Sequence, residues 1–161
     1  QNLGFRSVEQ LFLDDGWDSN EIWNLVLGDV NESGVDEYVG SSGQDVLMAG
    51  TVASSLYGGD GQDIMIGDNY GLKTSFELGN REGSWDLVAD IIQGFGSGDE
   101  LDLSNLGIYD SADVRADLSD EGIDELYATV DNVERKVAEF SNFNNDTTMD
   151  DVLASIVPDV V

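Results

Sequence analysis

Large hydrophobic residues recur in the middle of the chain at intervals of nine residues. Tyr38, Leu47, Leu56 and Met65 follow one another at this spacing, which differs from the period of about 3.6 expected of an amphipathic helix. Each residue is the centre of a three-residue segment that suits a short strand, whose central side chain points to one side. The pattern therefore predicts short strands whose hydrophobic side chains stack into a narrow core.

The residues before each predicted strand form a repeated turn motif. Residues 58–66, GGDGQDIMI, match the pattern G-G-x-G-x-D-x-U-x, in which U is a large hydrophobic residue. Residues 40–48 repeat it two nonapeptides earlier, with Ser41 in place of the second glycine. A weaker copy at 31–39 retains Gly34, Asp36 and Tyr38. The copy at 49–57 retains Leu56 but has lost its aspartate, and a further turn begins at Gly67 and Asp68.

This spacing predicts a parallel β-roll in which two nonapeptides complete one coil. Glycine in the first six residues tolerates positive φ angles and close backbone packing. Turns that lie two nonapeptides apart then stack on the same edge, with Asp45 directly under Asp63 and Gly43 under Gly61. Two carboxylates at this distance repel each other. A Ca²⁺ ion between them would reverse the sign of the interaction, with carbonyl oxygens of the turns completing its ligand shell.

The charge of the chain fits this picture. It carries 34 acidic residues against 6 basic ones, for a formal net charge of −28. Aspartate, the short-armed ligand for hard cations, outnumbers glutamate by 23 to 11. A compact body with this charge repels itself unless it takes up cations. The alternative is that the charge serves only solubility or halophilic adaptation.

The missing residue types exclude several classes of site. The chain has no Cys and no His, which rules out disulfides, Ser-His-Asp and Cys-His catalysis, and Cys/His zinc sites. The small number of basic residues argues against nucleic acid as a partner. No hydrophobic run approaches the ~20 residues that span a bilayer. No pair of carboxylates stands out as catalytic, so we expect no enzyme activity.

On these repeats the chain resembles the RTX, or hemolysin-type calcium-binding, family of bacterial secreted proteins. The resemblance implies that the side chains of Asp45 and Asp63 bind calcium. It also implies carbonyl ligands from the two turns, near Gly40, Ser42, Gly58 and Asp60. Gly43, Gly61 and Asp68 are further candidate ligands. The alternative is a series of ordinary Gly-Asp hairpin turns.

Residues 28–36 offer a second pattern of calcium ligands. Asp29, Asn31 and Ser33, followed by Gly34, have the spacing of the first half of an EF-hand loop, but position twelve is Gly40 rather than an acid. Asp29, Asn31 and Asp36 are therefore candidate ligands. The alternative is an Asx-turn before the strand at 37–39.

The flanking segments are expected to close the roll. Gln10–Leu13 and Ile22–Leu27 look like strands, and Trp17 and Trp23 should cover its open end. Residues 72–84 look like a polar excursion from the roll. Residues 111–118 should form a short helix, and 125–130 and 134–140 a hairpin about Asp131-Asn132. A final helix should follow the capping-box spacing at 147–150 and stop at Pro158.

Residues 85–106 resemble the D-x-I-x-x-F…G-D-x-L-D-L-S segment that follows the repeats in type I secretion substrates, and Leu101 and Leu103 show the alternation of a half-buried strand. Asp86 and Asp90 could supply carboxylates to the last turn of the roll, or could simply flank strands. The end, Asp159-Val160-Val161, resembles the acidic-then-apolar terminus of such substrates.

Together these features predict a mainly β fold: a short parallel β-roll with an N-terminal β cap and a C-terminal segment containing a hairpin and short helices. We expect residues 1–30 to form the cap or the end of an upstream domain, 31–84 the roll, and 85–161 the C-terminal cap and secretion signal. The expected function is calcium-dependent folding and type I secretion of a larger extracellular bacterial protein, such as an adhesin, a toxin or a surface-layer protein. Its partners would be Ca²⁺, the secretion machinery and upstream domains of the same polypeptide, without membrane insertion. The alternatives are a ligand-binding module of an adhesin or the tail of a secreted protease or lipase.

Overall fold

The computed structural model describes residues 24–27, 35–41, 43–49, 53–67, 72–81, 88–119, 121–144 and 146–157; for 24–27, 35 and 36 it describes the backbone alone. This part of the chain is mainly β, as predicted, with one short α-helix. Its strands are β1 (Asn24–Leu27), β2 (Val35–Val39), β3 (Asp45–Met48), β4 (Ala53–Tyr57), β5 (Ile64–Ile66), β6 (Thr74–Glu77), β7 (Asp90–Gln93), β8 (Glu100–Asp102), β9 (Val114–Asp117), β10 (Asp124–Val130) and β11 (Val133–Ser141).

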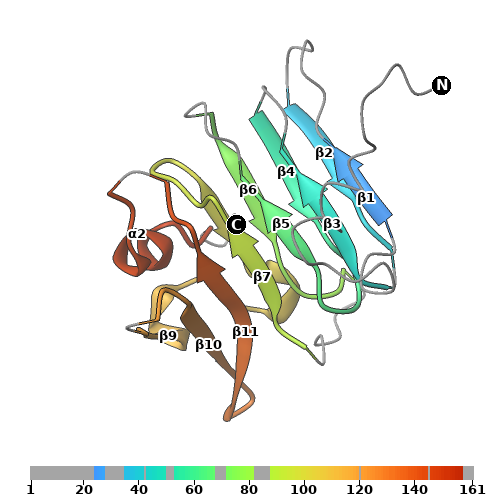
Figure 1. The fold of residues 1–161 in the computed structure, drawn as a ribbon. Helices are drawn as coiled ribbons and strands as arrows, with labels where there is room; N and C mark the ends of the chain where they lie inside the picture. The colour runs from blue at the N-terminus through green and yellow to red at the C-terminus, as the bar shows by residue number, and fades with distance from the viewer. Residues whose placement is uncertain are drawn as a thin grey trace, which may run out of the picture.

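Successive strands from β1 to β8 alternate between two sheets (Figure 1). Sheet A has the order β1-β3-β5-β7-β11-β10-β9, and sheet B has the order β2-β4-β6-β8. All neighbours among the first eight strands are parallel. Because each strand pairs with the strand after next, the chain crosses from one sheet to the other at every turn. β7 and β8, which lie in the predicted C-terminal segment 85–161, pair with β5 and β6 of the predicted roll.

The hydrophobic residues with nine-residue spacing form the core, as predicted. Leu47, Leu56 and Met65 are fully buried, and Tyr38 packs against them. In sheet A, the register places Leu47 beside Met65 and Met65 beside Ile92. In sheet B, Leu56 lies beside Phe76, and Phe76 beside Leu101. Each sheet therefore contributes one column of large hydrophobic side chains to the space between the sheets.

The C-terminal segment continues both sheets beyond the parallel strands. In sheet A, β11 pairs in parallel with β7, so that Phe140 lies beside Ile92. In sheet B, Ile156 forms an isolated parallel bridge with Leu101, supported by hydrogen bonds from Leu101 N to Ser155 O and from Val157 N to Leu101 O. Both edges at this end are thus covered, which satisfies backbone groups that would otherwise remain open for pairing.

The predicted hairpin is confirmed. β10 and β11 are antiparallel and joined at Asp131 and Asn132. Both residues have positive φ, at 53° and 64°, as a type I′ turn requires. The predicted final helix is also confirmed, as α2 (Met149–Ala154), with Thr148 as the N-cap residue. Thr148 N donates to Asp151 Oδ2 at 2.8 Å. The capping box therefore joins Thr148 and Asp151, one residue later than the predicted pair at 147 and 150.

Two predictions for local structure were wrong. The expected helix at 111–118 is a single 3-10 turn, Ser111–Asp113, followed by strand β9. Asp110 caps this turn through its side chain, but the alternating residues Val114 and Ala116 pack against the core, and β9 pairs with β10. Tertiary pairing therefore overrides the local helical signal. The expected polar excursion at 72–84 contains β6, whose Phe76 is part of the core.

The predictions for Gln10–Leu13, Trp17, Trp23 and residues 158–161 lie outside the described residues. Within the predicted strand Ile22–Leu27, the structure places β1. A second 3-10 turn, Ser104–Leu106, follows β8. Among the described residues, no helix has the length and hydrophobicity needed to cross a membrane.

Candidate metal centre

Three aspartates form a buried column across the N-terminal ends of three neighbouring strands of sheet A, which we call the sheet A edge. Asp45 begins β3, Asp63 immediately precedes β5, and Asp90 begins β7. The pairs Val46 with Ile64 and Ile64 with Ile91 set the register, so each aspartate is the neighbour of the next. Their exposed fractions are 0%, 0% and 2%. The predicted placement of Asp45 under Asp63 is confirmed, and Asp90 extends the column by one more strand.

The carboxylates of Asp63 and Asp90 each accept a hydrogen bond from the backbone N–H of the preceding aspartate in the column. Asp45 N donates to Asp63 Oδ1 at 2.9 Å. Asp63 N donates to Asp90 Oδ1, also at 2.9 Å. The side chains of Asp63 and Asp90 therefore point toward the preceding strand of the column, and adjacent strands lie ~4.8 Å apart.

The turns that precede β3 and β5 stack tightly because their glycines have no side chain. The close approach leaves no room for a Cβ atom at these positions. A Cβ on Gly61 would lie 2.9 Å from the carbonyl oxygen of Gly43, which confirms the predicted pairing of these glycines. A Cβ on Gly40 would overlap Gly58 O, and a Cβ on Gly58 would overlap Asp63 Oδ2. That carboxylate oxygen is buried. The space beside the turn glycines is thus lined by carboxylate and carbonyl oxygens.

Ser41 distinguishes the first turn from the second. Its hydroxyl lies 3.1 Å from Asp45 Oδ1 and 3.0 Å from Oδ2, and its backbone N–H also donates to Oδ2. The corresponding residue in the second turn is Gly59, with φ of +100° and no hydroxyl to donate. The two turns therefore surround their carboxylates with different donors.

The carboxylate and carbonyl oxygens of this edge are the types of ligand that a calcium ion takes. Ca²⁺ takes six to eight oxygen ligands at about 2.3–2.6 Å, and twice that distance matches the ~4.8 Å between adjacent strands. Carboxylates of neighbouring coils could therefore share one ion. Within the described ranges, no group of three or more acidic side chains is close enough to hold a metal by itself. Turn carbonyls, such as that of Gly58 beside Gly40, would have to supply the remaining ligands.

The other predicted ligands have different outcomes. Asp60 is exposed, and its Oδ1 accepts a hydrogen bond from Asn80 Nδ2, which ties the second turn to the segment after β6. The backbone of Asp36 lies in β2, beside Ser54 of β4. The remaining predicted ligands lie outside the described residues: Asp29, Asn31, Ser42, Asp68 and Asp86.

Sequence analysis missed the matching column at the opposite edge, in sheet B. Ser54 pairs with Thr74, and Thr74 lies beside Asp99, because Ser75 pairs with Glu100. All three side chains are buried. Ser54 occupies the aspartate position of the copy at 49–57, which could have identified it. Thr74 follows Ser54, and Asp99 follows Thr74, by more than the length of two nonapeptides. Both residues therefore fall outside the period of the repeats.

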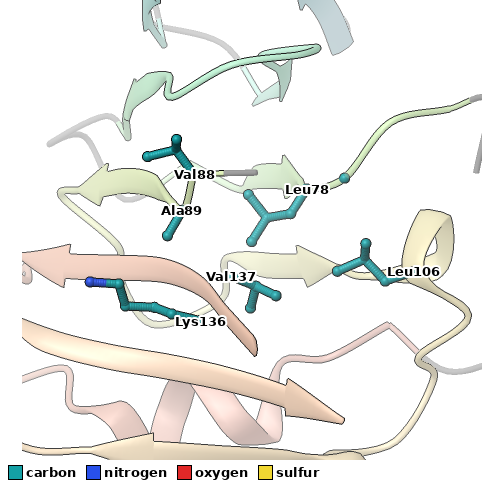
Figure 2. Close-up of a pocket in the computed structure, with 7 residues that line it drawn as sticks. Leu78, Val88, Ala89, Leu106, Lys136 and Val137 are labelled. Atoms are coloured by element: carbon teal, nitrogen blue, oxygen red, sulfur yellow. The ribbon is translucent and has the colours of Figure 1, made fainter. Parts of the chain in front are cut away.

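The described residues also line two hollows. The first is a cavity of about 10 Å³ in which Leu78, Leu106 and Val137 meet near Lys136, Val88 and Ala89 (Figure 2). It has room for about one water molecule. The second is an open groove of about 440 Å³ between the end of β9 and the start of α2, lined in part by Leu118, Phe143 and Met149. Neither hollow touches the aspartate column.

No protein-family model matches the chain, and no curated protein matches it.

Proposed function

We propose that the parallel strands β1–β8 form a calcium-binding β-roll, and that the chain is a non-catalytic domain whose folding depends on calcium. The observation that carries this proposal is the buried column of Asp45, Asp63 and Asp90 on adjacent strands. At an effective dielectric constant of 20, two charges ~4.8 Å apart repel by about 3–4 kcal/mol. Backbone hydrogen bonds offset part of this energy, and a divalent ion would reverse its sign.

Calcium would also join the roll to the C-terminal segment. Asp90 belongs to β7, and β7 pairs on its other side with β11, where Ala138 lies beside Asp90. An ion shared by Asp63 and Asp90 therefore acts at the strand onto which the C-terminal hairpin docks. Binding at this edge would stabilise both parts of the domain together.

The size of the effect follows from linkage. An ion that binds only the folded state stabilises it by RT ln(1 + [Ca]/Kd), which is ~1.4 kcal/mol per site at tenfold excess over Kd and ~2.7 kcal/mol at hundredfold excess. A few sites supply several kcal/mol, comparable with the ~5–15 kcal/mol stability of a whole domain. Extracellular modules bind calcium with Kd of ~10⁻⁴–10⁻³ M. We therefore propose a domain that is largely unfolded at cytosolic calcium and folded outside the cell.

This dependence would suit export of a larger extracellular protein by a type I secretion system. A chain that is unfolded inside the cell can pass through a narrow channel, and its folding outside opposes return. The resemblance of residues 85–106 to the segment that follows RTX repeats supports this assignment. Export of the full chain from bacteria that carry such a system should stop when residues 85–161 are deleted.

The calcium proposal is tested by far-UV circular dichroism and thermal melting of the full chain in EGTA, in 5 mM Ca²⁺ and in 5 mM Mg²⁺. We expect strand signal and a cooperative melt in Ca²⁺, and loss of most of both in EGTA. Mg²⁺ should substitute poorly, because it requires octahedral geometry at shorter distances. Identical spectra and melting temperatures in EGTA and Ca²⁺ would reject the proposal.

A further inference from the structure

We infer that the ions shared between neighbouring coils lie along the sheet A edge alone, and that hydrogen bonds close the corresponding positions of the sheet B edge without metal. This inference rests on the proposed calcium function and specifies where it operates. The two edges occupy equivalent places in the fold, since each lies where the chain enters a parallel strand. They differ in the residues that fill the column.

The sheet B column has hydroxyl side chains in its middle. Its register runs from Asp36 to Ser54, then to Thr74 and Asp99. The two acids are thus separated by three strand spacings, or ~14 Å. A calcium ion reaches its ligands over about 2.3–2.6 Å, so no single ion can join these two carboxylates. Adjacent carboxylates, as at Asp45 and Asp63, do not occur in this column.

Main-chain N–H groups donate to both carboxylate oxygens of Asp99. Ser54 N donates to Lys73 O at 3.1 Å. Thr74 N donates to Asp99 Oδ1 at 2.8 Å, and Gly96 N donates to Asp99 Oδ2 at 2.8 Å. Both oxygens of Asp99 therefore accept from the main chain. The bond from Thr74 N matches those of the sheet A column, so the two columns differ because the neighbour of Asp99 on the preceding strand is Thr74 and not a second carboxylate.

The neutral column also has an electrostatic consequence. Ser54 and Thr74 are 2% and 0% exposed, and uncharged groups at these positions add no repulsion between coils. The repulsion that removal of calcium exposes in the folded state should then arise at Asp45, Asp63 and Asp90 rather than in the sheet B column. Calcium would therefore act on the stability of the domain through the sheet A edge alone.

The inference is tested by calorimetric calcium titration of full-length variants. Asp63→Asn should remove at least one bound ion, because Asp63 lies between two neighbouring carboxylates. Ser54→Ala and Thr74→Val, which each delete one hydroxyl, should leave the number of bound ions and the calcium midpoint within twofold of the parent. Asp99→Asn should lower the melting temperature by breaking the bond from Gly96 N, yet retain the number of ions.

The outcomes separate this inference from the proposed function. Loss of an ion in Ser54→Ala, Thr74→Val or Asp99→Asn, beside loss in Asp63→Asn, would place calcium at both edges and overturn the one-sided arrangement while the calcium function stands. No binding by the parent chain would reject the function itself. If Asp99→Asn does not fold, the two hydroxyl variants still decide the question.

A gain of function gives the complementary test. The double variant Ser54→Asp/Thr74→Asp places two carboxylates on adjacent strands of sheet B, as in sheet A. It should bind one more ion than the parent and need more calcium to fold. The matched variant Ser54→Asn/Thr74→Asn has similar volume without charge and should bind no additional ion. An extra ion in both variants, or in neither, would contradict the argument from adjacent carboxylates.

Discussion

The backbone N–H of Asp45 donates a 2.9 Å hydrogen bond to the carboxylate of Asp63, the equivalent residue of the next coil. This bond fixes the distance between two buried acids on neighbouring strands. The same relationship recurs between Asp63 and Asp90, so the hydrogen bond between neighbouring aspartates is a repeated feature of this edge.

Replacing Asp63 with Asn should stabilise the metal-free chain and weaken its response to calcium. The amide retains the oxygen that accepts from Asp45 N, but removes a buried charge between two others. We expect the free energy of unfolding in EGTA to rise by about 1–3 kcal/mol, the usual cost of an imperfectly compensated buried group, while the gain on adding calcium shrinks. Urea titrations at a series of calcium concentrations, extrapolated to zero calcium, measure both quantities.

The control for this prediction is Asp113→Asn, which makes the same change at an exposed position outside the column. It should alter neither value by more than about 0.5 kcal/mol, as is usual for surface substitutions. A metal-free Asp63→Asn chain that is less stable than the parent would show that the carboxylate is needed for packing rather than for an ion.

The stacking of the two turns predicts a difference between glycines of similar backbone conformation. Gly61 and Gly98 have φ of +100° and +94°, so alanine at either position should cost about 1–2 kcal/mol in backbone strain. Only at Gly61 would the new Cβ meet another turn, 2.9 Å from Gly43 O, whereas Gly98 has nothing within 4 Å. Gly61→Ala should therefore have a lower melting temperature and a higher calcium midpoint than Gly98→Ala. Equal values would contradict the stacking.

The sequence predicted the parts of the site that follow a strict period. Asp45 and Asp63 are two nonapeptides apart, and one coil of that length places them together whatever the rest of the chain does. Asp90 lies further along the chain from Asp63 than one such coil, because the connection between β6 and β7, residues 78–89, is longer than a nonapeptide turn. Its membership in the column depends on strand pairing, which no local pattern records. The sequence therefore indicated Asp90 as a candidate ligand, but did not indicate that it lies beside Asp63.

The C-terminal segment illustrates the same limit. The positive-φ turn at Asp131 and Asn132 and the cap at Thr148 are local features, and both elements were predicted. Residues 114–117 form a strand because Val114 and Ala116 fill a hydrophobic surface beside β10, and that surface exists only in the folded domain. Thr74 was assigned to a polar excursion for a similar reason, since only the pairing of β6 with β4 reveals its buried position.

Arg81 should make the stability of sheet B depend on pH. Its guanidinium binds both carboxylate oxygens of Glu77, at 2.7 and 2.9 Å, contacts Glu37 and lies 4.1 Å from the centre of the Tyr57 ring. It therefore connects β2, β4 and β6. Burial alone would raise the pKa of the Glu77 carboxyl, but hydrogen bonds from Arg81 and Asn105 outweigh it and lower this pKa below its ordinary value of 4.5.

Because the folded-state pKa of Glu77 is lowered, its contribution is fully present above pH 4.5 and is lost as the pH falls through the folded-state value. Arg81→Lys loses the two-pronged bond and should reduce the free energy of unfolding at pH 7 by about 1 kcal/mol, allowing for the partial exposure of Arg81. The deficit should shrink toward pH 3. Arg115→Lys, at an exposed pair with Glu134, should cost less. A deficit that is constant from pH 7 to pH 3 would assign the effect to packing on Tyr57.

Substitutions in the hairpin turn should change the stability of the domain independently of the aspartate column at the sheet A edge. Asn132 has φ of 64°, which glycine adopts without the strain of a side chain, and Asn-Gly and Asp-Gly are the favoured type I′ turns. Asn132→Gly should raise the free energy of unfolding at saturating calcium by about 0.5 kcal/mol, whereas Asn132→Ala should lower it by about 1 kcal/mol. Neither should shift the calcium midpoint beyond what its change in stability accounts for, because residue 132 lies in the turn between β10 and β11, whereas the aspartate column lies at β3, β5 and β7. Opposite signs in thermal melts of the two variants would support a type I′ turn, while equal losses would show that the Asn132 side chain itself holds the turn.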